Sequence, residues 1–314
     1  MSFAEIIGQK RIINLLRRAL AQENLPHSFL FTGMEGIGKQ LTALTLAKVV
    51  NCENGAAGDC CDRCVSCRKA ASGNHPDINI IERDGPFIKI EQIRALKQRL
   101  RFKPFECRYR VTIINNAQNM KIEAANALLK VLEEPPAENL IILTAYEITS
   151  LLPTIVSRCL HLPFQPLATE EISTHLCQAH GVEPEKAAIM AELAGGSLSR
   201  AAALLDEKQL DRRRWLLETV AGIHESHITD LLAAAKAWKG EGPDLKQDLE
   251  WLKTWLRDLL VQQLEAADSI SLLNLDFAER WGGHLHSLSL IICWKYLNLS
   301  ALYKGLCVII LTRD

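Results

Sequence analysis

The sequence predicts an α/β protein in which a parallel-sheet domain is followed by two helical domains. In the first half of the 314-residue chain, short apolar stretches alternate with segments of helical periodicity. That alternation is typical of a parallel sheet with helices on both faces. Beyond Pro163 and Pro166 the strand-like stretches nearly vanish, and apolar residues recur at helical spacing, as at Leu249, Leu252 and Leu256.

The expected strands are five short apolar segments, at 28–32, 78–81, 111–114, 140–144 and 159–162. A Gly-rich turn leads from the first strand into a helix over 42–50. A second helix over 123–132 ends before Pro135 and Pro136, because proline cannot continue a helix. Three short helices are expected between 169 and 205. The predicted domains are a sheet domain at 1–165, a small helical domain at 166–208 and a larger helical domain at 209–314.

The charges of the chain are nearly balanced, with 36 Lys+Arg against 37 Asp+Glu. This excludes the strongly basic footprint of a protein that binds nucleic acid by itself. The N-terminus carries no apolar signal segment. Lys295 and Lys304 interrupt the longest apolar stretch, at 288–311, so it does not read as a membrane span. We expect a soluble, cytoplasmic protein.

A phosphate-binding loop is predicted between the first strand and its helix. Gly33, Gly36 and Gly38 precede Lys39 in a G-x4-G-K pattern, in which backbone N–H groups surround phosphates and the lysine reaches the terminal ones. The full pattern continues with Ser or Thr, whose hydroxyl binds Mg²⁺, but this chain has Gln40. ATP or ADP binding therefore stays open, and poor Mg²⁺ binding is expected.

The second half of an ATPase site is also altered. A carboxylate pair that holds Mg²⁺ and polarises water would follow the third strand, but Asn115 and Asn116 stand there. Asparagine lacks the negative charge and cannot act as a general base. Asn-Asn after a strand is also ordinary turn chemistry. Because Gln40 and both asparagines affect the metal and base functions, we expect no ATP turnover.

Four cysteines predict a structural metal centre at about 52–67. Cys52, Cys61, Cys64 and Cys67 supply four thiolates with two overlapping C-x2-C steps, which suits tetrahedral Zn²⁺ with no open coordination position. An iron–sulfur cluster and the absence of metal are the alternatives. Cys60 adjoins a ligand and is interpreted as a bystander, or as a replacement for Cys61.

Several motifs in the order expected for one family cover about residues 1–205. They are Ile7-Gly8-Gln9, His27, the phosphate loop, the four cysteines, Asn126-Ala127-Leu128-Leu129-Lys130 with Glu133-Glu134-Pro135-Pro136, and Ser157-Arg158-Cys159. Together they resemble the subunits of the bacterial DNA polymerase III clamp loader, which belong to the AAA+ family. The resemblance implies an AAA+ sheet domain with an inserted zinc module, a lid domain at 166–208 and a collar at 209–314 through which subunits form a ring.

Two subunit types of this family share the motifs, and the departures favour one of them. The tau/gamma motor type has Ser/Thr after the lysine and Asp-Glu after the third strand. The delta-prime type keeps Ser-Arg-Cys with a degenerate ATPase site, as this chain does with Gln40 and Asn115. The resemblance implies a non-catalytic stator of the DNA polymerase III holoenzyme that helps to load the beta clamp on primed DNA. A catalytically active tau/gamma-type ATPase is the alternative, and a stand-alone P-loop enzyme is a third hypothesis.

The resemblance also implies residue roles and partners. Arg158 would act in trans as an arginine finger in a neighbour's ATP site, Arg200 would sense nucleotide from the lid, and Thr144 would lie near the γ-phosphate. The implied partners are the tau/gamma and delta subunits in a hetero-oligomer, the beta clamp indirectly, and primer–template DNA weakly or through the complex. No membrane is implied.

A basic segment at 94–110 interleaves its charges with Phe102, Phe105 and Tyr109. A solvated helix face is the first interpretation of the charges, and contact with the DNA backbone is the second. The aromatic side chains are expected to pack the segment onto the sheet domain, with base stacking as the alternative. A buried or partner-covered helix is the interpretation of the apolar stretch at 288–311, and the structure and role of 281–314 stay open.

Overall fold

The computed structural model describes residues 2–22, 24–55, 58–221 and 245–263. Two compact units are present and are described separately: the first holds residues 1–181 and 194–200, and the second holds 182–193 and 201–314. The boundaries predicted at 165 and 208 stay predictions. Among the residues described, no helix is long and apolar enough to cross a membrane. The apolar stretch at 288–311 and the segment 281–314 lie outside the described residues.

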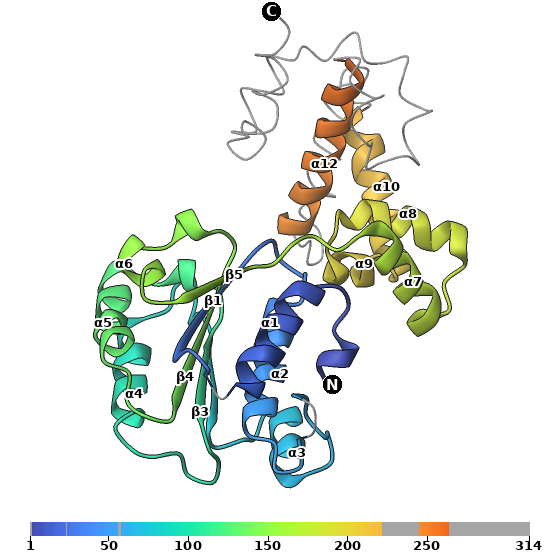
Figure 1. Ribbon diagram of the computed structural model, residues 1–314. Coiled ribbons are helices and arrows are strands. Elements are labelled where there is room, and N and C mark those ends of the chain that lie inside the picture. The colour runs from blue at the N-terminus through green and yellow to red at the C-terminus, as the bar shows by residue number, and fades with distance from the viewer. Residues whose placement is uncertain (1, 23, 56–57, 222–244, 264–314) are drawn as a thin grey trace, which may run out of the picture. The chain divides into compact units, whose positions relative to one another are not determined.

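The first unit contains a five-stranded sheet with the strand order β2-β3-β4-β1-β5 (Figure 1). All neighbouring strands are parallel. The strands are β1 Ser28–Thr32, β2 Ile78–Ile81, β3 Arg110–Ile114, β4 Asn139–Ala145 and β5 Leu160–Pro163. Each predicted strand lies within one residue of an observed one at both ends. The prediction of a parallel α/β sheet is therefore confirmed.

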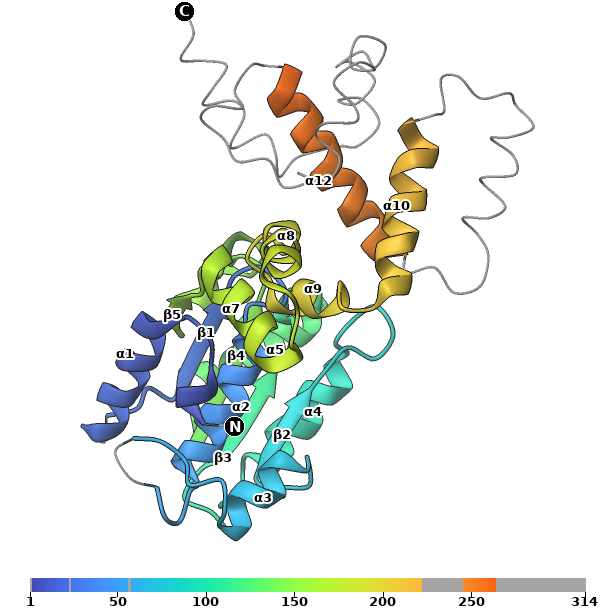
Figure 2. The same cartoon turned by 90° about the vertical axis from the view of Figure 1, so that its right-hand side faces the viewer.

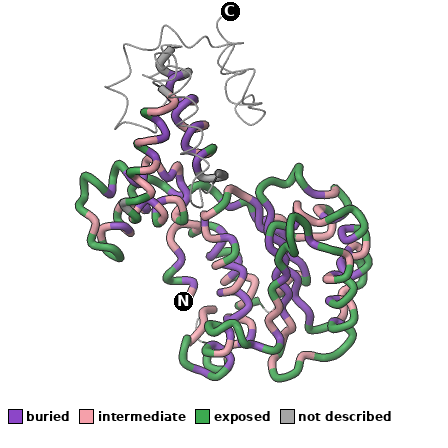
Figure 3. Tube along the Cα trace, turned by 180° about the vertical axis from the view of Figure 1, so that it is seen from behind, coloured by how far each residue is buried: buried purple, intermediate pink, exposed green. Residues whose placement is uncertain are grey.

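Helices cover both faces of this sheet, because alternate strand residues point to opposite faces. Phe29 and Phe31 of β1 pack into a core with α1 and α2. Leu30, between them, packs into the core of the other face. The burial pattern in Figure 3 shows both cores as buried segments along the strands and the inner sides of the helices. The helices are α1 Lys10–Ala21 and α2 Lys39–Val50 on one face, and α4 Ile90–Arg99, α5 Ile122–Glu133 and α6 Pro153–Val156 on the other.

The remaining elements of the first unit are short segments and one longer helix. They are η1 Phe3–Glu5, α3 Val65–Ala71, η2 Ala117–Asn119, η3 Ile148–Ser150 and α7 Thr169–His180. Helix α2 begins three residues before the predicted start at 42, because the phosphate loop leads into it through Gly38 at φ 97°. Helix α5 ends at Glu133, just before Glu134-Pro135, as the sequence predicted.

The second unit is helical in its described part, as predicted. Its helices are α10 Glu207–Ala221 and α12 Leu245–Gln263, while α8 Pro184–Ala194 and α9 Leu198–Ala203 have residues in both units. Helices α10 and α12 are labelled in Figure 2. Leu216 and Leu217 of α10 form a buried cluster with Trp251 and Trp255 of α12.

The ends of the parallel strands form two opposite borders of the sheet, which are called its edges here. Because the strands are parallel, the segments that follow β3, β4 and β1 meet at one edge, and these three strands are neighbours in the sheet. The segments that precede β1 and β5 meet at the opposite edge. Ligands of open parallel sheets bind outside the carboxyl ends of the strands, so the first edge is where a nucleotide site is expected.

Candidate functional site

The phosphate loop connects β1 to α2, and its shape depends on glycine. Gly33, Gly36 and Gly38 have φ angles of 142°, 81° and 97°, which side-chain-bearing residues rarely adopt. A Cβ on Gly36 would lie 2.2 Å from the Ser197 hydroxyl oxygen, and one on Gly33 would lie 2.7 Å from the Phe164 carbonyl oxygen. These glycines are therefore required both by backbone conformation and by close packing.

Lys39 is the first residue of α2, and its ammonium lies within the loop. Nζ donates to the carbonyl oxygens of Gly33 at 2.5 Å and of Met34 at 2.6 Å. Burial lowers the pKa of Lys39 to about 8, against the opposing influence of the Glu35 carboxylate. A neighbouring anion favours the charged form of a partly desolvated cation of this kind.

No neighbouring hydroxyl of α2 takes the place of the Ser or Thr hydroxyl that the full phosphate-loop pattern has after the lysine. Gln40 is exposed at the second position of α2. Thr42, the nearest hydroxyl in the helix, is fully buried and donates to the carbonyl oxygen of Gly38 at 2.9 Å. Since its side chain is bonded back onto the helix, Thr42 does not take over the role of the missing Ser or Thr.

The asparagine pair lies at the same edge of the sheet. The Asn115 side chain donates to Glu82 Oε1 at 3.1 Å, while its Oδ1 is buried without a hydrogen-bond partner. The Asn116 N–H donates to the Thr144 hydroxyl at 3.0 Å, and Asn116 is left-handed at φ 52°, a conformation that asparagine tolerates. Neither asparagine offers a charge to a metal.

Glu82 was not singled out by sequence reasoning. It follows β2 directly, so its place one strand away from the asparagines could have been found from the rule that parallel strands end at one edge. Its carboxylate is exposed and bonded to Asn115. Thr144 ends up beside Asn116, at the edge predicted for the γ-phosphate.

Arg200 is close in sequence to residues that contact the loop. The Ser199 N–H donates to the Gly36 carbonyl oxygen at 3.3 Å, and the Ser197 hydroxyl accepts from the Arg200 N–H at 3.3 Å. The predicted nucleotide-binding residues Gly33, Gly36, Gly38, Lys39 and Arg200 therefore belong to one neighbourhood of the first unit.

The four predicted metal ligands come together. The sulfur atoms of Cys52, Cys61, Cys64 and Cys67 all lie within 4.8 Å of one another. Cys52 follows α2, Cys61 lies in the loop, and Cys64 caps α3, which carries Cys67. Cys60 is outside this group, and its thiol points to Asp62 at 3.6 Å. The arrangement thus favours Cys61 over Cys60 as the ligand.

Backbone N–H groups point at these sulfur atoms, as they do around bound thiolates. The Cys61 N–H donates to Cys52 Sγ at 3.3 Å, the Cys64 N–H to Cys61 Sγ at 3.3 Å, and the Cys67 N–H to Cys64 Sγ at 3.4 Å. Hydrogen bonds from the backbone of Arg63 and Cys64 lower the pKa of Cys61 to about 6, whereas burial raises the pKa of Cys52. Four soft donors with N–H support fit a tetrahedral Zn²⁺.

A second group of possible ligands, His75, Asp77 and Cys107, is better explained as a structural cluster. The Asp77 carboxylate accepts from the N–H groups of Phe105 at 2.7 Å and Glu106 at 2.9 Å, and pairs with Arg110 at 3.3 Å. The Asp77 N–H donates to His75 Nδ1 at 3.1 Å, which leaves Nε2 facing Cys107 Sγ at 3.2 Å. Since its oxygens already hold the loop backbone, Asp77 fixes the loop rather than a metal.

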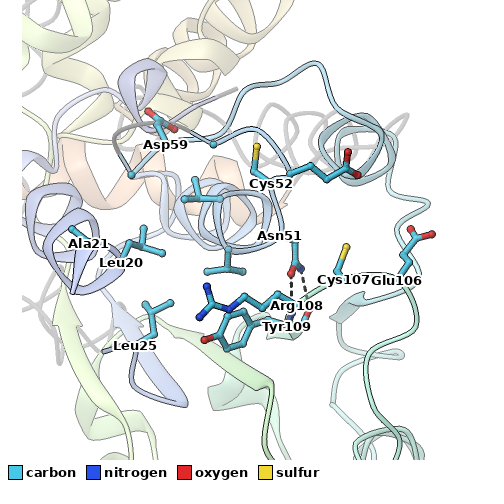
Figure 4. Close-up of a pocket in the computed structure, with 15 residues that line it drawn as sticks. Leu20, Ala21, Leu25, Asn51, Cys52, Asp59, Glu106, Cys107, Arg108 and Tyr109 are labelled. Atoms are coloured by element: carbon cyan, nitrogen blue, oxygen red, sulfur yellow. Dashed lines mark hydrogen bonds between the residues drawn. The ribbon is translucent and has the colours of Figure 1, made fainter. Parts of the chain in front are cut away.

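A pocket of about 450 Å³ borders the cysteine centre (Figure 4). It lies between the ends of α1 and α2 and the segment 106–109, and both Cys52 and Cys107 line it. At its base, Asn51 exchanges two hydrogen bonds of 2.9 Å with the backbone of Tyr109. The pocket therefore marks the junction at which the cysteine loop meets the sheet.

The packing predicted for the basic segment is wrong for two of its three aromatic residues. Phe102 and Phe105 are 72% and 82% exposed, whereas Tyr109 packs against the core. The reason is that backbone contacts hold this turn: Arg110 donates to the carbonyl oxygens of Phe102 at 2.7 Å and Lys103 at 2.8 Å. The aromatic side chains are not needed for its packing and point outward.

Arg158 lies at the edge of the sheet opposite to the phosphate loop. It follows α6 and precedes β5, and its carbonyl oxygen accepts from the Ser28 hydroxyl at 2.7 Å at the start of β1. Its guanidinium pairs with Glu133 at 2.7 Å and donates to the Thr154 carbonyl oxygen at 2.9 Å. Burial raises the pKa of the adjacent Cys159 to about 11, so that thiol is a packing group.

Comparison with known proteins shows similarity to subunits of DNA polymerase III. The family model described as DNA polymerase III, delta subunit, matches residues 8–168. The chain is 39% identical over 185 residues to the DNA polymerase III subunit delta′ of Bacillus subtilis, a match that covers 59% of this chain and 56% of the relative. It is 29% identical over 282 residues to DNA polymerase III subunit tau of the same organism, covering 82% and 50%.

The chain thus spans about half the length of these curated relatives. Among solved structures, it is similar to a DNA polymerase III gamma subunit-related protein of Thermotoga maritima at 19% identity and a TM-score of 0.42, over 77% of this chain and 96% of that one.

Proposed function

Because the chain belongs to the DNA polymerase III delta subunit family, we propose that it is a non-catalytic stator of a bacterial sliding-clamp loader, of the delta-prime type. In this role it binds tau/gamma motor subunits and a delta subunit in a ring. It completes a neighbour's ATP site and helps to load the beta clamp on primed DNA. Contact with primer–template DNA occurs weakly or through the assembled complex.

The loss of metal and base functions supports the stator role. Gln40, Asn115 and Asn116 stand where Mg²⁺ binding and water activation require a hydroxyl and carboxylates. Thr42 is bonded to Gly38 and does not compensate. Lys39 and the loop glycines would still permit ATP or ADP to bind, without turnover.

The position of Arg158 is the observation that carries the proposal. Ser28, which bonds its carbonyl oxygen, is at the start of β1, whereas Gly33 of the phosphate loop follows the end of that strand. Five residues of extended strand span roughly 16 Å. An arginine held at the opposite edge acts on its own phosphate loop only with difficulty, and this supports a role in the ATP site of an adjoining subunit. An arginine finger in trans is worth about 10³–10⁵ in rate.

Zinc is proposed as the structural ion of the four-cysteine centre. The donor set is all-thiolate, so it leaves no position for substrate water, and the backbone N–H groups support the sulfur charges. The ion would order the loop between α2 and α3. It would take no part in ATP chemistry.

The alternative is a tau/gamma-type subunit with its own ATPase. The 29% identity to subunit tau over 82% of this chain favours it. It requires Glu82, or another group, to supply what Asn115 and Asn116 lack. Steady-state ATP hydrolysis by the isolated chain that disappears in Lys39→Ala would establish the alternative and overturn the stator role.

The deciding experiment is reconstitution of a loader from purified subunits, with ATP hydrolysis measured on clamp and primed DNA. The isolated chain is expected to show no turnover, and Arg158→Ala in the assembly is expected to lower the rate. Arg68→Ala, which removes an exposed arginine of α3, is the matched control and should leave the rate unchanged. Native mass spectrometry of each assembly shows whether a lost rate reflects a lost subunit.

A further inference from the structure

The guanidinium of Arg158 is held by groups of its own chain. Nη2 pairs with Glu133 at 2.7 Å, and Nη1 donates to the Thr154 carbonyl oxygen at 2.9 Å and the Ser157 hydroxyl at 3.2 Å. Thr154 and Ser157 belong to α6 and its end, whereas Glu133 is the last residue of α5, which lies beside α6 (Figure 1). The contact therefore joins two helices separated by β4.

The position of Glu133 is unfavourable for helix stability. The C-terminus of a helix carries a partial negative charge, so a carboxylate at the last residue is repelled, while a cation there is favoured. Glu133 ends α5 and Glu134 follows it. The carboxylate of Glu133 therefore does not stabilise the helix that carries it. Its partner Arg158 offsets the local negative charge.

The ion pair is too exposed to hold the fold together. The side chains of Arg158 and Glu133 are 34% and 48% exposed, and an exposed pair shifts an equilibrium by no more than about fivefold. A terminal phosphate offers an arginine more charge and paired acceptors than one carboxylate does. The pair with Glu133 is therefore strong enough to select one position of the guanidinium, and weak enough for a phosphate to displace.

A carboxylate at this distance also cancels the field of the arginine. Electrostatic catalysis needs an uncompensated charge aimed at the transferred phosphoryl group, and a guanidinium paired at 2.7 Å does not present one. An open hollow of about 730 Å³, lined by Pro26, His27, Glu133 and Arg158, adjoins the pair. It gives the guanidinium room to leave Glu133 without moving the backbone, which Ser28 holds.

We propose that Glu133 is a latch that keeps Arg158 in a resting position until the terminal phosphate of a neighbouring subunit's nucleotide displaces it. This inference rests on the proposed function, because it assigns a regulator to the proposed arginine finger. The latch lowers basal hydrolysis in a loosely assembled ring, and it is released where a triphosphate comes within reach.

The latch is tested with Glu133→Gln, which keeps the shape and removes the charge. Glu134→Gln makes the same change of charge one residue further on and is the matched control. In the isolated chain, the Nε–H resonance of Arg158 is assigned with Arg158→Lys. Its relaxation should report a more mobile guanidinium in Glu133→Gln and an unchanged one in Glu134→Gln. Equal mobility in both variants overturns the proposal.

In the reconstituted loader, Glu133→Gln should raise the ATP hydrolysis rate by a factor between about 1.5 and 5, and Glu134→Gln should not. The increase should vanish when Arg158→Ala is added. If Arg158→Ala lowers turnover, the latch is overturned by a rate that falls in Glu133→Gln, or by a rate that is the same in Glu133→Gln and Glu134→Gln. If Arg158→Ala has no effect on turnover, the proposed function itself is wrong and the latch falls with it.

Discussion

The carboxylate of Asp59 accepts a hydrogen bond from the guanidinium of Arg17 at 2.9 Å, and this contact joins the cysteine loop to α1. The same carboxylate accepts from the Phe3 N–H at 2.9 Å. Asp62, further along the loop, pairs with the buried Lys48 of α2. The loop is thus held by η1, α1 and α2 together, so a metal that orders the loop also supports the packing of the N-terminal segment.

Metal content is the first prediction. The purified chain should hold about one zinc ion, because four thiolates complete a tetrahedral site. Cys61→Ser should lose most of this zinc on dialysis and unfold at a lower temperature, since metal binding contributes to folding. Cys60→Ser should keep both the zinc and the melting temperature. Elemental analysis and calorimetry measure the two quantities.

The paired serine variants also separate the alternatives. Retention of zinc in Cys61→Ser with loss in Cys60→Ser would mean that Cys60 is the ligand. Visible absorbance with iron and sulfide in the purified chain would replace zinc by an iron–sulfur cluster. A chain that carries no metal, with both variants equally stable, would leave the four cysteines as packing groups.

The fold was predictable because its signals are local. Strands such as 28–32 and 140–144 are nearly continuous apolar runs, which is typical of buried parallel strands, and the glycines of the phosphate loop are visible in the sequence. The contacts that shape the site are not local. Glu82 reaches Asn115, and Glu133 reaches Arg158, across 33 and 25 residues, and no periodicity connects such pairs.

The aromatic residues of the basic segment at 94–110 are a second case in which contacts between residues distant in sequence decide the outcome. Their spacing among charges predicted packing, but whether Phe102 is buried depends on what else holds its turn. Arg110 and Asp77 hold it through backbone groups. Residue type and spacing therefore predicted the packing of Tyr109 correctly, but they were wrong for Phe102 and Phe105, and the helix expected for the basic segment ends at Arg99.

The buried carboxylate of Asp77 yields the second prediction. Asp77→Asn should lower the free energy of unfolding by about 2–4 kcal/mol at neutral pH, since it removes a carboxylate that accepts two backbone N–H groups and that is the ion-pair partner of Arg110. Urea denaturation measures the loss. Asp84→Asn, which removes an exposed partner of Lys89, is the control and should change stability by less than about 0.5 kcal/mol.

The effect of Asp77 should depend on pH in a defined direction. Burial acts to raise the pKa of Asp77, but hydrogen bonds from Glu106 and Phe105 and the charge of Arg110 outweigh it and lower that pKa below 3.8. A depressed carboxyl pKa stabilises the fold above the unfolded value and loses this contribution as pH falls through the folded value. The stability difference between Asp77→Asn and the wild type should therefore shrink below about pH 4. A difference that is constant from pH 7 to pH 3 would contradict the charged role of Asp77.

Lys39 gives the third prediction, on anion binding in the phosphate loop. Burial lowers its pKa to about 8, so the unliganded lysine loses its charge as pH rises through 8. If the ammonium is the form that binds phosphate, the affinity for ADP should fall about tenfold between pH 7 and pH 9. Titration with a fluorescent ADP analogue in the absence of Mg²⁺ measures this. Lys39→Arg keeps its charge over the whole range, so any affinity that it retains should not change with pH. The same pH dependence in Lys39→Arg would assign the titration to another group. No binding by the wild type at either pH would show that the loop does not bind the nucleotide.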